Sequence, residues 1–202
     1  MKKLESSFTN MVIVLTLITV IAAACLGAMY KATAEPIAIA KKAKQEEAIK
    51  AVLPQFSKIE EDSVNGQQIF RAFNENNQLV GIAIKTSELG FGGDIVTMVG
   101  IDASGSIINY TLLQHAETPG LGSKLTDWFK VKSDIRGANS NNVPLKVNKD
   151  GGSYNAITAA TISSRAFLNS INKAYDTYQK ALENVSPTNA LNENTTQTQP
   201  NK

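Results

Sequence analysis

The chain has 202 residues, of which 43% are hydrophobic, and its formal net charge is +2. This length suits one ordinary domain with some additions, and so small a charge gives no reason to expect a nucleic-acid partner. One Cys and one His are too few for an iron–sulfur cluster or a structural zinc site, and a lone Cys25 excludes an intrachain disulfide. We therefore expect no metal site and, for any redox function, an organic cofactor.

The first feature along the chain is an uncharged segment from Ser6 to Tyr30, whose middle reads MVIVLTLITVIAAACLGAM. About 20 helical residues span the roughly 30 Å hydrocarbon core of a bilayer, so this segment predicts a single transmembrane helix. A cleaved signal peptide and a lipoprotein signal ending at Cys25 are the alternatives, but the apolar run is longer than a signal core and continues past Cys25. Lysines lie on both sides of the segment, so the positive-inside rule does not fix its orientation.

A domain of mixed helices and strands is predicted after this segment. Apolar residues at helical spacing predict a surface helix from Pro36 to Leu53, ending before Pro54. An antiparallel meander follows, because four segments rich in β-branched and aromatic residues are separated by the turn sequences ENN, ELGFGG and ASG. These four segments are residues 67–74, 78–86, 94–102 and 106–114.

Two helices complete the predicted α+β fold, a short one at 124–131 and an amphipathic one at 162–182, with the polar loop GANSNNVP between them. The Asn-, Thr- and Gln-rich tail at 186–202 is expected to be disordered. The predicted organisation is therefore a stub, transmembrane anchor and linker at 1–35, a domain with an antiparallel sheet and flanking helices at 36–185, and a polar tail.

Three stretches rich in glycine or hydroxyl groups interrupt this pattern: LGFGGDI (89–95), HAETPGLGSK (115–124) and NAITAATISSR (155–165). Taken singly, the first predicts a hairpin loop and the second a turn into a helix. In the third, Thr158 can cap the following helix, and Thr161, Ser163 and Ser164 can bond its first amides. Capping does not explain why residues 158–161 are all small, which suits close approach of a bulky anion to the helix N-terminus.

The three stretches together resemble a known family. TAATISSR resembles the S/T-G-A-T-x-[ST]-S motif of the FMN-binding subunits of Rnf and Na⁺-translocating quinone reductase complexes, in which FMN is joined through its phosphate to the last threonine of the triplet. LGFGGDI is similar to that family's G-Y-G-G loop, and HAETPGLG is similar to its H-x-E-T-P-G-L-G signature. The resemblance covers the chain from the anchor to about Leu182. It favours the G subunit of Rnf over the C subunit of the quinone reductase, which is typically larger.

The resemblance implies a set of site residues. Thr161 would be the attachment site of a covalent FMN, with Thr158, Ala159 and Ala160 forming the approach to it. The flavin pocket would be lined by residues of the second stretch, Glu117, Thr118, Gly120, Leu121 and Gly122, and a neighbouring wall would be formed by Gly90, Gly92 and Gly93. Two positions depart from the family pattern: Asn155 replaces the usual Asp, and Ala159 replaces the usual Gly.

The resemblance also implies a function, that of an electron carrier without catalytic residues of its own. The chain would belong to an Rnf-type ferredoxin:NAD⁺ oxidoreductase that is coupled to Na⁺ or H⁺ translocation. Its partners would be the other subunits of that complex and, during maturation, a flavin transferase that uses FAD and a divalent metal. The family places such a chain in the bacterial inner membrane, as a single-pass protein with its FMN domain facing the periplasm.

Without the resemblance, composition and pattern alone favour a different class of protein, a membrane-anchored binding or assembly module with no cofactor. Under that interpretation the three stretches are simply loops and caps.

Overall fold

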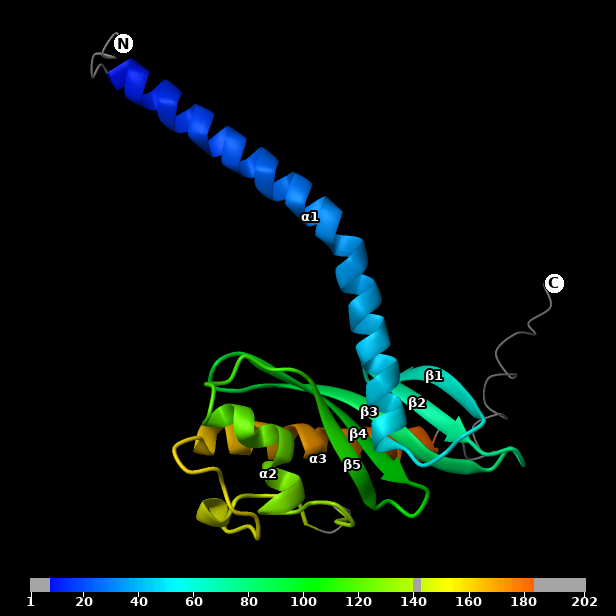
Figure 1. Cartoon of the computed structure of the whole chain (residues 1–202). Helices are drawn as coiled ribbons and strands as arrows, with labels where there is room; N and C mark the ends of the chain where they lie inside the picture. The colour runs from blue at the N-terminus through cyan, green and yellow to red at the C-terminus, as the bar shows by residue number, and fades with distance from the viewer. Residues whose placement is uncertain (1–7, 140–142, 184–202) are drawn as a thin grey trace, which may run out of the picture. The chain divides into compact units, whose positions relative to one another are not determined.

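The structure of the chain is a computed structural model that describes residues 8–139 and 143–183 (Figure 1). It divides into two compact units between Lys44 and Gln45. The stub before residue 8, part of the predicted polar loop and the tail predicted to be disordered lie outside the described residues.

The first unit contains most of the long helix α1 (Phe8–Val52). By length and composition, its apolar part is able to cross a membrane: the mean hydropathy of its most apolar window is 2.6, and none of that window is buried. Our prediction of a separate helix beginning at Pro36 was wrong, because Pro36 lies inside α1. Proline removes one backbone hydrogen bond, but the Ala-, Lys- and Glu-rich residues around it favour helix strongly enough to continue.

The second unit contains a five-stranded antiparallel sheet in which the strands pair in chain order. The strands are β1 (Lys58–Val64), β2 (Gln67–Phe73), β3 (Leu79–Leu89), β4 (Asp94–Asp102) and β5 (Ile107–Gln114). The predicted meander of β2 to β5 is confirmed, whereas β1 was missed. All but one of the residues of β1 are exposed, so this edge strand shows no apolar alternation.

Both faces of the sheet are covered, because successive side chains of a strand point to opposite faces. On one face, Ile82 and Ile84 of β3 pack in the main core with α3 (Thr161–Glu183). On the other face, Ala83 and Met98 pack with Ala48, Ile49 and Val52, which belong to the last turns of α1. A Cβ on Gly100 would lie 1.9 Å from the carbonyl oxygen of Val52, so glycine is needed where this helix end meets β4.

The two predicted helices of the domain are present as α2 (Leu125–Val131) and α3. Two short 3₁₀ helices, η1 (Gly122–Lys124) and η2 (Asn148–Asp150), lie in the connections. The ring of Phe167 in α3 packs against those of Tyr110 and Phe129, with centroids 4.7 and 4.9 Å away. These buried rings fix α3 between the sheet and α2, and thereby fix the position of its N-terminus.

Candidate functional site

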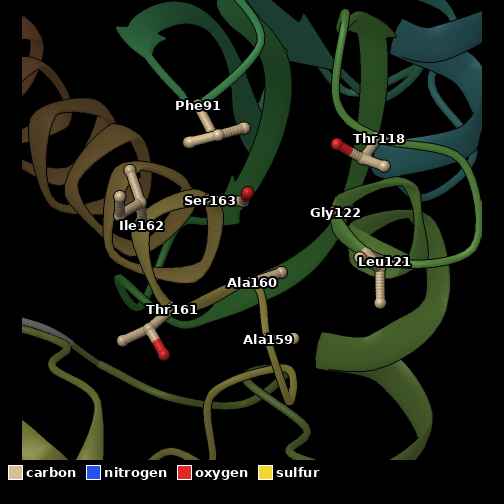
Figure 2. A pocket seen from close by; sticks show the side chains of 9 residues that line it. All are labelled: Phe91, Thr118, Leu121, Gly122, Ala159, Ala160, Thr161, Ile162 and Ser163. Carbon is tan, nitrogen blue, oxygen red and sulfur yellow. The ribbon is translucent and has the colours of Figure 1, made fainter.

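A pocket of about 460 Å³ opens beside the N-terminus of α3 (Figure 2). Each of the three stretches singled out in the sequence contributes to its lining. Phe91 comes from the loop between β3 and β4, and Thr118, Leu121 and Gly122 come from the segment after β5. The third stretch contributes Ala159 to Ser163. Segments far apart in the chain thus meet around one cavity.

Half of the predicted site residues line this pocket, namely Thr118, Leu121, Gly122, Ala159, Ala160 and Thr161. The others lie outside its lining, namely Thr158, Glu117, Gly90, Gly92, Gly93 and Gly120. The lining also includes Phe91, Ile162 and Ser163, which sequence reasoning had not assigned to the site. The sequence did offer a sign that these three residues belong to the site. Phe91 directly follows Gly90, and Ile162 and Ser163 are the first and second residues after Thr161.

The N-terminus of α3 presents unpaired backbone donors at the pocket. The first helical hydrogen bond runs from the amide of Ser164 to the carbonyl oxygen of Ala160, at 3.0 Å. The amides of Thr161, Ile162 and Ser163 therefore precede the helical ladder. Within residues 8–139 and 143–183, none of these three amides has a hydrogen-bond acceptor. Together with the helix dipole, such amides form a site suited to phosphate.

The hydroxyl groups of this stretch do not cap α3 as simple capping predicts. Ser164 Oγ accepts a hydrogen bond from the Ile157 amide and donates one to the Ala160 carbonyl, so it binds the loop before the helix. Thr161 is half-buried at the pocket, and in the described part of the chain its hydroxyl makes no hydrogen bond to protein. Helix capping thus leaves the Thr161 hydroxyl unexplained.

Glu117 is buried behind the pocket, with 5% of its surface exposed. Its Oε1 accepts hydrogen bonds from the amides of Phe91 and Gly92, at 2.9 and 3.1 Å, and its Oε2 accepts one from the hydroxyl of Ser163. A Cβ on Gly90 would lie 2.2 Å from Oε1, so the first stretch leaves room for this carboxylate. Glu117 therefore connects all three stretches without lining the pocket.

Ala159 adopts a left-handed backbone conformation, with φ of 62°. It lies in a tight turn closed by a hydrogen bond from the Ala160 amide to the Ile157 carbonyl, at 3.0 Å. Such a turn favours glycine at this position, because an L-residue with a Cβ is strained there by about 1–2 kcal/mol. The departure at Ala159 thus has a conformational cost as well as an added methyl group.

Asn155 holds the preceding loop through its backbone and its side chain. Its carbonyl oxygen accepts a hydrogen bond from Trp128 Nε1 at 2.7 Å, and its Oδ1 accepts one from Asn148 Nδ2 at 2.9 Å. An aspartate can accept the same two hydrogen bonds, so the local structure is compatible with either residue. Among the described residues, no group of three or more His, Cys, Asp or Glu side chains is arranged to hold a metal ion.

Part of this chain is similar to a known domain family, and that part contains the pocket. Residues 90–176, which include all of the predicted site residues, match the FMN-binding domain family. Several similar proteins are named as the G subunit of an ion-translocating oxidoreductase complex. The relative from Methanosarcina acetivorans is 27% identical over 185 residues, which cover 85% of this chain and 95% of that protein.

Two bacterial relatives with the same name are more similar over shorter stretches. The Salmonella typhi protein is 34% identical over 111 residues, covering 53% of this chain and 54% of that protein. The Vibrio vulnificus protein is 38% identical over 101 residues, covering 48% of each. The chain thus spans about half the length of these bacterial relatives. The crystal structure of NqrC from Shewanella oneidensis is also similar, with a TM-score of 0.47 and 16% identity, covering 67% of this chain and 73% of that one.

Proposed function

We propose that this chain is a membrane-anchored electron-transfer subunit that carries FMN on Thr161. Two similarities support this proposal: residues 90–176 match the FMN-binding domain family, and the chain is similar to the G subunits of ion-translocating oxidoreductase complexes. The observation that supports the attachment site is the unpartnered hydroxyl of Thr161, which in the described part of the chain lies next to three unpaired amides at the edge of the pocket. When bound, FMN supplies the redox chemistry, and the protein holds and orients it.

The pocket fits such a group in size and in chemistry. Its volume lies within the roughly 300–1,000 Å³ range of small-molecule and cofactor sites. Phe91, Leu121 and Ile162 offer apolar surface for a flat ring system, while the amides at the start of α3 suit its phosphate. Figure 2 shows the side chains of Phe91 and Ile162 on one side of the pocket and that of Leu121 on the other.

A covalent bond explains how such a carrier would keep its cofactor. The dipole of one helix contributes about 0.3–2 kcal/mol, which is less than two decades in affinity. A phosphoester to the Thr161 oxygen removes dissociation altogether. No side chain hydrogen-bonds this hydroxyl to activate it among the described residues. Formation of the bond therefore requires a separate flavin transferase, which would use FAD and a divalent metal. The Thr161 oxygen would bond to the phosphorus of the FMN half of FAD, the pyrophosphate bond of FAD would break, and AMP and the hydroxyl proton would be released.

The assembly and location follow from the same proposal. The neighbours of the chain would be the other subunits of an Rnf-type ferredoxin:NAD⁺ oxidoreductase, and α1 would anchor the chain in the inner membrane. The domain at 36–185 would face the periplasm. Electrons would pass through this domain between neighbouring subunits during ion translocation.

The attachment site is tested by flavin fluorescence in a denaturing gel, with the full chain co-expressed with an active flavin transferase. The wild type should give a fluorescent band and Thr161→Ala a dark one. Thr126→Ala is the control, because Thr126 is an exposed threonine of α2 outside the pocket lining, and its band should stay fluorescent. A fluorescent Thr161→Ala band, or a dark wild-type band, would contradict the proposal.

A further inference from the structure

Among the described residues, Phe91 is the one aromatic side chain in the lining of the pocket, and it is 68% exposed. It lies in a loop with Gly90 on one side and Gly92 and Gly93 on the other, so its immediate neighbours restrict its backbone little. One hydrogen bond within the loop, from the Gly90 amide to the Gly93 carbonyl at 2.9 Å, closes the turn. Contacts from outside the loop must therefore fix the orientation of Phe91.

Glu117 supplies those contacts. Its Oε1 accepts a hydrogen bond from the amide of Phe91 itself and another from the next residue, Gly92. Its Oε2 accepts a hydrogen bond from the hydroxyl of Ser163, which lies two residues after Thr161 on α3. One buried carboxylate therefore fixes the aromatic loop relative to the helix end that carries the acceptor threonine.

We propose that Glu117 is a positioning residue for the flavin: it holds Phe91 as the wall against which the isoalloxazine ring packs, and it does not touch the ring. This inference rests on the proposed attachment of FMN to Thr161. Tethering through Thr161 leaves the ring free to rotate about the ribityl chain, so a fixed wall is needed to give it one orientation. An aromatic face is suited to pack against a second flat ring system.

The positioning role makes a different prediction from a role for the negative charge. In Glu117→Gln, the amide oxygen can still accept from the two loop amides, and the amide nitrogen can donate to Ser163 Oγ. Glu117→Gln should therefore retain the orientation of Phe91, whereas Glu117→Ala should lose it. If the charge of Glu117 were the important property, both variants would behave alike.

The test uses the full chain, co-expressed with a flavin transferase and purified in detergent. The visible circular dichroism of the flavin reports how firmly the ring is held, and in-gel fluorescence normalises it to covalent flavin. Glu117→Ala and Phe91→Ala should each keep the covalent flavin and lower the dichroism at least twofold, and the double variant should lower it no further. Glu117→Gln should stay near the wild type. Glu88→Ala is the control, because Glu88 lies near the end of β3, shortly before the loop, but pairs with Lys173; the dichroism of this variant should not change.

Three results would overturn the inference: wild-type dichroism in Phe91→Ala, equal losses in Glu117→Gln and Glu117→Ala, or additive losses in the double variant. If Glu117→Ala does not fold, two other variants still test the inference: Phe91→Ala, which changes an exposed side chain, and Glu117→Gln, which keeps the shape of the side chain. A dark wild-type band after denaturation would remove the proposed function as well. A fluorescent band with unchanged dichroism in Phe91→Ala would overturn this inference alone.

Discussion

The buried carboxylate of Glu117 accepts a hydrogen bond from the hydroxyl of Ser163, which lies 46 residues further along the chain. Both residues are almost fully excluded from solvent, with 5% and 2% of their surfaces exposed. This contact joins the segment after β5 to the first turn of α3, so it contributes to the stability of the domain as well as to the geometry of the pocket.

We expect Ser163→Ala to lower the free energy of unfolding by about 1–3 kcal/mol, because it leaves a buried carboxylate oxygen without its donor. Chemical denaturation of the full chain in detergent measures the change. Ser153→Ala, at an exposed serine, is the matched control and should leave the midpoint unchanged. Equal midpoints for the two variants would show that the Glu117–Ser163 contact contributes nothing to stability.

A glycine at position 159 should stabilise the domain, because the left-handed conformation of Ala159 is strained. The relief of about 1–2 kcal/mol exceeds the loss of about 0.4–1 kcal/mol from the greater freedom of glycine in the unfolded chain. We therefore expect Ala159→Gly to raise the melting temperature by a few degrees. Ala160→Gly is the control, because Ala160 has no positive φ and is 7% exposed, and it should lower the melting temperature. A decrease in both variants would contradict the argument.

The stability of the turn between β4 and β5 should depend on pH through Asp102. Burial alone would raise the pKa of Asp102, but hydrogen bonds from Ser104 and from the amide of Ser106 outweigh it and hold the pKa below its usual 3.8. A carboxyl whose pKa is lower in the folded state stabilises the fold above its unfolded pKa, and this contribution is lost as the pH falls through the folded pKa. The difference in melting temperature between wild type and Asp102→Asn should therefore be larger at pH 6 than at pH 3. The same difference at both pH values would show that the carboxylate gives no net stabilisation.

The side of the membrane can be tested with a single engineered thiol at Ser57, which is exposed at the start of the domain. The native Cys25 is replaced by alanine, so that Ser57→Cys provides the sole thiol of the chain. If the FMN domain faces the periplasm, an impermeant thiol reagent should label this variant in intact spheroplasts. Labelling only after lysis would place the domain on the cytoplasmic side.

Local sequence patterns predicted most of the second unit. Strands β2 to β5 contain enough β-branched and aromatic residues to be recognised, and α3 has one apolar face that packs on β3 and β4. Strand β1 lacked such a pattern, since its charged residues all face solvent at the sheet edge. The Asn65–Gly66 pair, in which both residues have positive φ, closes the β1–β2 hairpin and was the signal that was overlooked.

The motifs located the pocket, but the role of each residue within it depends on contacts between distant segments. Glu117 lies in a polar turn, and the resemblance alone suggests a place for it along the flavin pocket. The structure adds that its side chain accepts hydrogen bonds from two amides of another loop. Those partners are 26 and 25 residues away in sequence, so no local pattern indicates them. Similarly, the strain at Ala159 becomes visible only through its backbone angle.

The last turns of α1 set a limit on where the chain can be cut. Ala48, Ile49 and Val52 cover Phe70, Ala72, Ala83 and Met98 of the sheet, so they are part of the core of the second unit. A soluble version that begins before Gln45 keeps this cover. One that begins at Pro54 leaves an apolar sheet face bare, which favours self-association. A protease that cleaves within residues 45–53 would accordingly do more than release the domain: it would remove part of its core.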